Sequence, residues 1–260
     1  MHPIIQRSAQ AVLKRLPRRF NGLLVRLARD QVPDSVREQC GLLDGAWSLR
    51  NAAANGLAPG AIVDVGACRG KWSLAARKIF PRAQVLMIEA NPECKIYLAE
   101  AVRALPGAAC ELVLLGPRAA AAVPFYQMQE GSSVLPELSD VPRRCVALEM
   151  RTLDQVVEAH ALPGPLLLKL DVQGFELEVL KGGGGTLARS AAVFMEVSFI
   201  PYNQDAPLFA AVVAQMAAQG FVLYDLCSTR RRAADGALFQ SDVLFVREDS
   251  PLRSPKPFFR

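Results

Sequence analysis

The sequence predicts an α/β domain with a doubly wound, mostly parallel sheet and a terminal antiparallel hairpin. Three observations lead to this prediction. From residue 61 onward, short apolar runs alternate with helical patterns, as expected for repeated strand–helix units. Several runs are almost continuously apolar, which is typical of strands buried on both faces of a sheet. The last two runs are joined by a polar loop without a helical pattern, which favours a hairpin.

Each element has a local signal in the chain. We expect the main strands at residues 61–65, 85–89, 111–115, 166–172, 192–198, 221–226 and 242–246, with further hairpin strands at 123–127 and 145–150. We expect helices at residues 71–80, 91–105, 152–160, 175–181 and 208–219. Asn91 is expected to cap a helix that has Pro92 at its first position. Thr152 and Gln155 have the spacing of a capping box. The glycines at 182–185 are expected to end a helix and form a loop.

The chain is predicted to have three parts. Residues 1–45 form a basic amphipathic helical segment, with leucines on one side and arginines on the other. Such a helix either lies on an anionic membrane surface through residues 1–30, or packs its leucines on the domain. Residues 46–247 form the α/β domain, and residues 248–260 a proline-rich basic tail.

Composition excludes several classes of protein. Of the 260 residues 51% are hydrophobic and 21% charged, so a large core is expected and wholesale disorder is not. The net charge of +5 comes from the two ends of the chain, since residues 41–246 carry a small acidic excess. We therefore expect no nucleic-acid partner for the core. The six cysteines form no C-x-x-C pair, which argues against a zinc site and fits a cytoplasmic protein.

Two strand ends carry residues suited to a nucleoside ligand. The first strand ends in Asp64-Val65, followed by Gly66 and, four residues later, Gly70. This turn lacks the three-glycine spacing of a pyrophosphate site. The second strand ends in Glu89, whose carboxylate could accept hydrogen bonds from both hydroxyls of an adenosine ribose. Together these residues form the pattern of S-adenosylmethionine (SAM) sites in doubly wound, Rossmann-like methyltransferases.

The chain resembles the FkbM family of SAM-dependent methyltransferases over about residues 60–225. The similar stretches are Ile62-Val-Asp-Val-Gly-Ala-Cys-Arg-Gly70, Met87-Ile-Glu-Ala-Asn-Pro92, Gly131-Ser-Ser-Val-Leu135, Arg151-Thr-Leu-Asp154, Leu168-Lys-Leu-Asp-Val-Gln-Gly-Phe-Glu-Leu-Glu-Val-Leu-Lys-Gly182 and Phe194-Met-Glu-Val197. The chain departs from the family pattern at Cys68-Arg69, at Ala90 and at Gln173, where glutamate is commoner.

The resemblance implies O-methylation of a hydroxyl on a sugar, glycoconjugate or natural product. The residues expected to bind SAM are Asp64, Gly66, Ala67, Gly70, Glu89, Ala90, Asn91, Ser133 and Asp171. An alcohol loses a proton when it is methylated, and the two histidines of the chain are poorly placed to take it. We therefore expect Asp171, and after it Glu196, as the base. Lys169 is expected to pair with Asp171, and no metal-ligand triad is legible.

Two other functions remain open from the sequence. A nucleotide-dependent Rossmann-type oxidoreductase would use a similar sheet, but it would need the three turn glycines and a Tyr or Ser proton donor near a lysine. A methyltransferase-like domain without catalysis could bind a partner or a membrane. With or without catalysis, contact through residues 1–30 would place a cytoplasmic protein at the inner membrane surface. Oligomeric state and the identity of the acceptor cannot be derived from the residues.

Overall fold

The main sheet consists of parallel strands with antiparallel strands at one edge. Its strands are β1 (Ala61–Val65), β2 (Gln84–Glu89), β3 (Ala108–Leu112), β7 (Leu166–Leu170), β8 (Ser190–Ser198), β9 (Phe221–Leu226), β10 (Arg230–Arg231) and β11 (Leu238–Arg247). They lie in the order β10-β11-β8-β7-β1-β2-β3, and β9 also pairs with β11. Strand β11 runs antiparallel to β8, β9 and β10, whereas the pairs from β8 to β3 are parallel. The predicted sheet and its terminal hairpin are confirmed.

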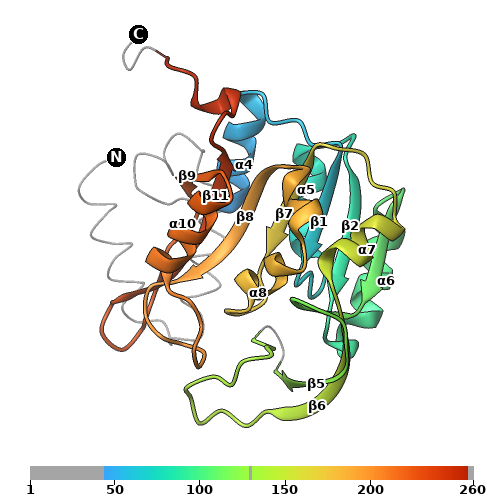
Figure 1. Cartoon of the computed structure of the whole chain (residues 1–260), viewed down its shortest axis with the longest axis vertical. Helices are drawn as coiled ribbons and strands as arrows, with labels where there is room; N and C mark the ends of the chain where they lie inside the picture. The colour runs from blue at the N-terminus through green and yellow to red at the C-terminus, as the bar shows by residue number, and fades with distance from the viewer. Residues whose placement is uncertain (1–43, 129–130, 257–260) are drawn as a thin grey trace, which may run out of the picture. The chain divides into compact units, whose positions relative to one another are not determined.

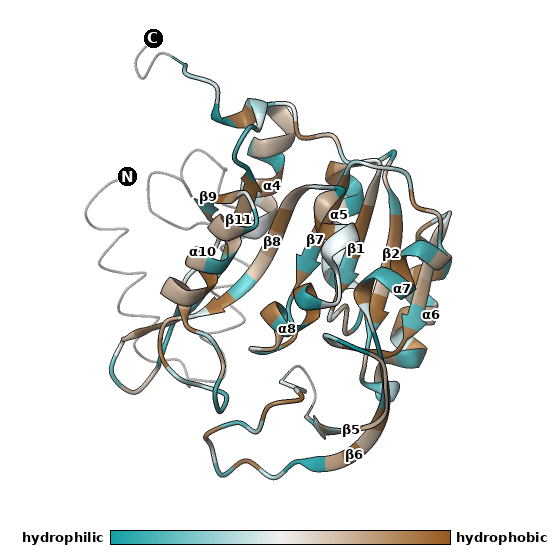
Figure 2. Ribbon diagram, in the orientation of Figure 1, coloured by the Kyte–Doolittle hydropathy of each residue, from teal (hydrophilic) through white to brown (hydrophobic). Residues whose placement is uncertain are grey.

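Helices cover both faces of this sheet (Figure 1). They are α4 (Gly45–Ala54), α5 (Lys71–Ile79), α6 (Lys95–Ala104), α7 (Leu153–Ala159), α8 (Glu176–Lys181), α9 (Gly184–Ala188) and α10 (Phe209–Ala218), with 3₁₀ turns η1 (Pro92–Cys94) and η2 (Pro251–Arg253). Alternate strand residues separate into two cores: Val63 and Leu168 pack with α7 to α10, while Ile62 and Leu167 pack with α4 to α6. The central strands are therefore mostly apolar, with Asp64 in β1 and Lys169 in β7 as exceptions. Figure 2 shows brown, hydrophobic stretches along β2, interrupted by teal segments in β1 and β7.

A second, three-stranded sheet lies beyond the carboxyl ends of the main strands (Figure 1). It contains β4 (Leu114–Leu115), β5 (Ala120–Gln127) and β6 (Arg144–Arg151), and the predicted hairpin of β5 with β6 is confirmed. The predicted strand at 111–115 is wrong in its extent, because β3 ends at Leu112 and β4 pairs with β6. Leu114 packs against Phe125 and Met150 in a small separate core, which draws the chain out of the main sheet.

Side-chain caps define two helix starts as predicted. Asn91 accepts a hydrogen bond from the Glu93 N–H at the start of η1, and Thr152 forms a full capping box with Gln155. The predicted loop over residues 182–185 is wrong, since α9 begins at Gly184. The Asp154 carboxylate accepts hydrogen bonds from the N–H groups of the first turn of α9, at 2.9 and 2.7 Å, and so stabilises a helix that its glycines disfavour.

The computed structural model describes residues 44–128 and 131–256. The predicted basic segment of residues 1–45 lies almost wholly outside the described residues. Helix α4, which the sequence analysis did not predict, is capped by Asp44. In the C-terminal tail, Leu252 packs in the same core as Leu49 of α4. Within the described part of the chain, no helix has the length and apolar character needed to cross a membrane.

Candidate active site

A cavity of about 230 Å³ lies at the carboxyl ends of β1, β2 and β7. Its walls come from the turns after these three strands, from β4 and β5, and from β10. The apolar part of the wall includes Ile88, Val113, Leu114, Leu115, Phe125, Val134 and Phe175. The polar part includes Glu89, Lys169, Asp171, Gln173 and Arg230. Ligands of open α/β sheets bind at this edge.

The turn after β1 approaches the turn after β7 very closely. Gly66 has φ +74°, and a Cβ atom there would lie 1.9 Å from the backbone carbonyl oxygen of Asp171. Only glycine avoids both the strained backbone and this clash. The turn is fixed on its other side because the Gly66 N–H donates to the carbonyl oxygen of Ile88 at 2.9 Å. The glycine therefore keeps three strand ends together at the cavity.

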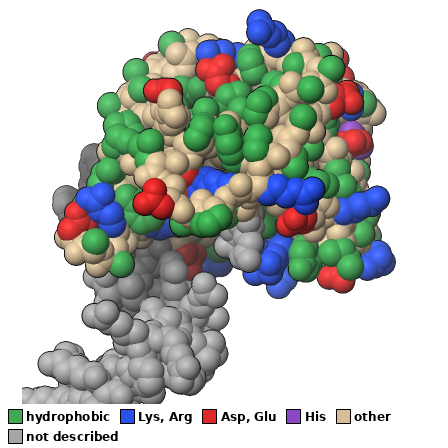
Figure 3. Space-filling model, turned by 90° about the horizontal axis from the view of Figure 1, so that it is seen from below, with side chains coloured by type: hydrophobic (Ala, Val, Ile, Leu, Met, Phe, Trp, Pro, Cys, Tyr) green, Lys and Arg blue, Asp and Glu red, His purple; other side chains and the backbone are tan. Residues whose placement is uncertain are grey.

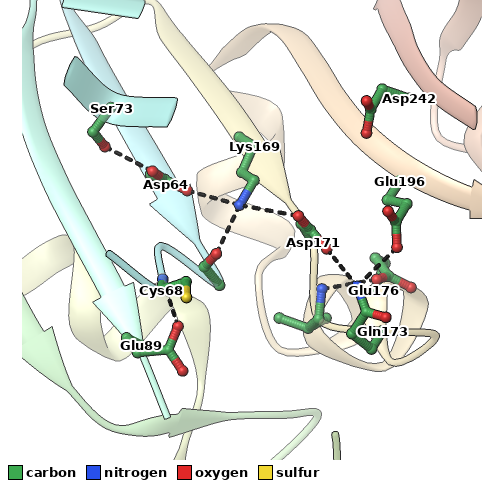
Figure 4. Close-up of polar contacts among 12 residues, drawn as sticks. Asp64, Cys68, Ser73, Glu89, Lys169, Asp171, Gln173, Glu176, Glu196 and Asp242 are labelled. Carbon is green, nitrogen blue, oxygen red and sulfur yellow. Dashed lines mark hydrogen bonds and ion pairs between the residues drawn. The ribbon is translucent and has the colours of Figure 1, made fainter. Parts of the chain in front are cut away.

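Glu89 joins the turn after β1 to the turn after β2. Its Oε2 accepts a hydrogen bond from the Cys68 N–H at 2.7 Å (Figure 4). Its Oε1 accepts one from the Asn91 N–H, also at 2.7 Å. Burial raises the pKa of Glu89, and the backbone hydrogen bonds counteract that rise. Each carboxylate oxygen can accept a second hydrogen bond, so Glu89 can hold the loop and still bind ligand hydroxyls.

Lys169 links the strands beneath the cavity. Its Nζ lies 3.0 Å from Oδ1 of Asp64 and 3.6 Å from Oδ2 of Asp171, and donates to the Gly66 carbonyl at 2.8 Å (Figure 4). The expected pairing of Lys169 with Asp171 is present, but Asp64 lies closer. Burial lowers the pKa of Lys169, but the carboxylates of Asp64 and Asp171 outweigh it and raise the pKa above its usual value.

Asp171 and Glu196 lie on either side of one side-chain amide. Nε2 of Gln173 donates to Oδ1 of Asp171 and to Oε2 of Glu196, in both cases at 2.8 Å (Figure 4). Asp171 is on the wall of the cavity with about a third of its side chain exposed (32%), whereas Glu196 is buried behind it. Of the two expected bases, Asp171 is the one in position to meet a ligand.

Glu196 receives donors from three directions. Nε2 of Gln240 donates to its Oε2 at 3.0 Å, and an Nη of Arg230 lies 2.9 Å from its Oε1. Burial raises the pKa of Glu196 well above its usual value, and the neighbouring Asp171 raises it further, while Arg230 lowers it. Because the contacts from Gln173, Gln240 and Arg230 are all donor contacts, they fit the carboxylate form.

Buried polar contacts brace the turn after β7. The Glu176 carboxylate accepts from the N–H groups of Val172 at 2.9 Å and Gly174 at 3.2 Å, and burial raises its pKa to about 7. Ser133, from the loop between β5 and β6, donates to the Gln173 carbonyl at 3.0 Å. These bonds hold the residues that follow Asp171 in place.

Six of the residues predicted to bind SAM line the cavity: Gly66, Ala67, Glu89, Ala90, Ser133 and Asp171. Three others do not reach its wall. Asp64 is fully buried and accepts from Ser73 Oγ at 2.7 Å; Asn91 is buried beside Gln127; and Gly70 packs against α6, where a Cβ would lie 2.6 Å from that of Ala101. These three residues support the cavity from behind.

Sequence reasoning missed several residues at the site. Arg230 and Gln240 reach Glu196 because β11 lies next to β8, a pairing between residues more than 40 positions apart. From the sequence, these two residues could be assigned only to the polar loop of the terminal hairpin. His160 lies away from the cavity and pairs with Glu111 at 2.9 Å. Among residues 44–128 and 131–256, no group of three or more His, Cys, Asp or Glu side chains is arranged to hold a metal ion.

The model of the methyltransferase FkbM domain matches residues 64–223 of the chain. Similar solved structures include a methyltransferase FkbM from Methylobacillus flagellatus KT, at 14% identity and TM-score 0.45, covering 72% of this chain and 43% of that chain. A precorrin-6y C5,15-methyltransferase from Geobacter metallireducens GS-15 is 9% identical with TM-score 0.43, covering 77% of this chain and 86% of that one. A putative RNA methyltransferase from Pyrococcus horikoshii is 14% identical with TM-score 0.43, covering 78% and 82%.

The chain thus spans less than half of the length of that FkbM structure. No curated protein matches the chain. The family model covers well over half of the 260 residues, and the matched part contains Asp64, Glu89, Asp171 and Glu196. The resemblance that the sequence motifs indicated is confirmed: the chain belongs to the FkbM methyltransferase family.

Proposed function

We propose that the protein is a SAM-dependent O-methyltransferase that acts on a hydroxyl of a sugar, glycoconjugate or natural product, with Asp171 as the base. The observation that carries the proposal is the position of Asp171. Its carboxylate is on the wall of the cavity that Glu89 also lines, and it is the more exposed of the two expected bases. Membership of the FkbM family supports methyl transfer rather than hydride transfer.

The cavity has the chemistry that SAM requires. Glu89 would accept hydrogen bonds from the ribose hydroxyls, since each of its oxygens retains an acceptor position. The apolar wall formed by Ile88, Val113 and Leu114 would enclose the adenine ring. The turn after β1, at Gly66 and Ala67, would face the methionine part. When bound, SAM supplies a methyl group on a sulfonium, ready for in-line displacement.

The residues of the chain have three tasks in this reaction. Asp171 accepts the proton of the acceptor hydroxyl as its oxygen is methylated. The contacts of Asp171 with Lys169 and Gln173 hold its carboxylate in a fixed orientation, so that the acceptor oxygen is aligned when it binds. The apolar wall excludes water from the reacting groups.

Surface charge supports a small or glycan acceptor. The face seen from below in Figure 3 mixes Lys and Arg with Asp, Glu and hydrophobic side chains, whereas a surface that binds nucleic acid carries a continuous basic stripe. We also propose that the enzyme is cytoplasmic and that residues 1–30 contact the membrane surface peripherally. A noncatalytic domain is the less favoured function, because it would not require a carboxylate exposed at the cavity.

Substitution of Asp171 tests the proposed function. Asp171→Asn keeps the size of the side chain and removes the basic oxygen, so kcat with a hydroxyl acceptor should fall by about 10²-fold or more. The affinity for SAM, measured by calorimetry, should stay within about threefold of wild type. Asp249→Asn, an exposed residue of the tail, is the matched control and should leave both quantities unchanged.

Three results would contradict parts of this assignment. A wild-type kcat in Asp171→Asn, measured with the true acceptor, would remove Asp171 from catalysis altogether. A collapse of SAM affinity would make Asp171 a cofactor ligand and leave Glu196 as the base. Failure of the wild type to bind SAM at all would overturn the proposed methyl transfer.

A further inference from the structure

Gln173 is held in an unusual conformation at the centre of the site. Its backbone has φ +57°, in the left-handed region that residues other than glycine rarely adopt. Its carbonyl oxygen accepts from Ser133 Oγ at 3.0 Å and from Asn203 Nδ2 at 2.5 Å. Two loops that are distant in sequence thus fix the backbone of this residue, and its side chain lines the cavity. Such strain persists only where the surroundings impose it.

The side-chain amide of Gln173 can have only one orientation. Both hydrogens of Nε2 are used, one on Asp171 and one on Glu196. If the amide were reversed, its oxygen would face two carboxylates, which offer no hydrogen to share. The amide is therefore a neutral double donor between two acids that would otherwise repel each other.

We propose that Gln173 is a positioning residue, whose amide keeps Asp171 and Glu196 in place as an ionised pair with neither a proton nor a cation between them. A glutamate at this position would put a third carboxylate in contact with the other two. The three acids would then have to take up a proton or bind a divalent cation. With the amide of Gln173 in contact with both acids, neither a proton nor a cation is needed between them.

Other charged groups also face this pair, and they are the same in every variant below. They are Lys169 from β7 with its partner Asp64 from β1, Glu176 from α8, Arg230 from β10 and Asp242 from β11. Lys169 and Arg230 each contact one acid of the pair, at 3.6 and 2.9 Å. The amide of Gln173 differs from both cations in that it contacts the two acids at once.

Thermal unfolding of the full chain as a function of pH tests the proposal without any ligand. Gln173→Glu keeps the shape and replaces the donor by a third acid, so its Tm should be about 5 °C or more below wild type at pH 8. The deficit should shrink at pH 5, where a protonated carboxyl can again donate. Added Mg²⁺ should raise the Tm of this variant at pH 8 and leave that of wild type unchanged.

Two further variants separate this electrostatic role from packing. Gln173→Met has a side chain of similar size but no hydrogen-bond donor and no charge. Its Tm should therefore stay unchanged when Mg²⁺ is added, whereas the Tm of Gln173→Glu should rise. Gln204→Glu adds the same charge at an exposed position of a nearby loop and should unfold like wild type at both pH values. A Tm deficit of Gln173→Glu that is equal at pH 5 and pH 8 would show that the residue only packs, and would overturn the proposal.

The activity measurement rests on the proposed function. In Gln173→Glu, the acid limb of the profile of kcat/KM against pH should move up by about one unit, with KM for SAM within about twofold of wild type. An unmoved acid limb would overturn the link to the base. If the wild type methylates no hydroxyl acceptor, the proposed function fails, while the unfolding experiment still decides the role of Gln173.

Discussion

The ammonium of Lys169 lies 3.0 Å from Oδ1 of Asp64, in an ion pair that is buried on both sides and joins β7 to β1. The same Nζ donates to the Gly66 carbonyl at 2.8 Å, so one cation fixes a strand, a neighbouring strand and the turn between strand and helix. The relationship explains why a charged side chain occurs in an otherwise apolar strand. Both the stability of the sheet and the geometry of the cavity therefore depend on Lys169.

Removal of this cation should be costly. In Lys169→Met, the Asp64 carboxylate and the Gly66 carbonyl lose a buried partner, and the free energy of unfolding should fall by about 3–5 kcal/mol. Denaturant unfolding followed by circular dichroism measures this change. Lys181→Met is the matched control: Lys181 forms an exposed pair with Glu178 on α8, so its loss should matter little. Equal stability of the two variants would contradict the proposed importance of the buried pair.

A methyl group at Gly66 should disrupt the contact between the turns. Gly66→Ala adds a Cβ that would lie 1.9 Å from the Asp171 carbonyl, so we expect a loss of about 3 kcal/mol or more together with loss of SAM binding. Gly107→Ala has nearly the same φ, +79°, but nothing within 4 Å of the new Cβ. It should cost only about 1–2 kcal/mol from the backbone. A similar cost in both variants would mean that the turns separate easily.

Much of the main sheet could be predicted because its signal is local. An apolar run such as residues 61–65 indicates a buried strand by itself, and capping side chains mark the starts of helices. The errors arose where a distant contact decides the structure. Residues 114–115 leave the main sheet for Met150, and α9 forms on a glycine-rich segment because Asp154 caps it. Neither partner can be inferred from the segment alone.

The site divides in the same way. The positions of Glu89 and Asp171 at the cavity could be predicted because Glu89 ends β2, Asp171 directly follows β7, and parallel strands end at one edge. Gln173 was visible as a departure from the family pattern, but its contact with two acids requires the backbone turn that gives φ +57°. Arg230 could not be predicted, since its approach to Glu196 depends on the register of the terminal hairpin.

Glu89 should contribute strongly to SAM affinity. Glu89→Ala removes the acceptor for the ribose hydroxyls and releases the N–H groups of Cys68 and Asn91, so the Kd should rise about ten- to a hundredfold or more. Calorimetric titration with SAM gives the value. Glu93→Ala removes an exposed acid four residues further along and should stay within about twofold of wild type. Unchanged affinity in Glu89→Ala would remove this residue from the cofactor site and weaken the whole assignment.

The basic N-terminal segment makes a separate prediction about membranes. If residues 1–30 bind an anionic surface, the full chain should co-sediment with vesicles that contain acidic lipids at low salt, and added salt should release it. A chain that lacks residues 1–30 should remain in the supernatant and still bind SAM. If the shortened chain instead aggregates or unfolds early, the leucines of the segment belong to the core, and the membrane hypothesis is wrong.

The raised pKa of Glu176 predicts a pH-dependent stability. Burial raises the pKa of this carboxyl from 4.5 in the unfolded chain to about 7 in the folded protein, so between these values the folded state binds the proton more tightly. Its contribution is therefore fully present below about pH 4.5 and is lost as the pH rises through about 7. The loss should amount to about 3 kcal/mol.

Comparison with a neutral isostere isolates this contribution from the other acids of the site. Glu176→Gln cannot ionise, and its amide oxygen can still accept from the Val172 and Gly174 N–H groups. The free energy of unfolding of wild type minus that of Glu176→Gln should therefore fall as the pH is raised from 4.5 to 8. Glu178→Gln, which removes the carboxylate that pairs with Lys181 on the same helix, is the matched control. A difference that stays constant with pH would mean that Glu176 titrates normally, and that the turn after Asp171 tolerates a charge there without cost.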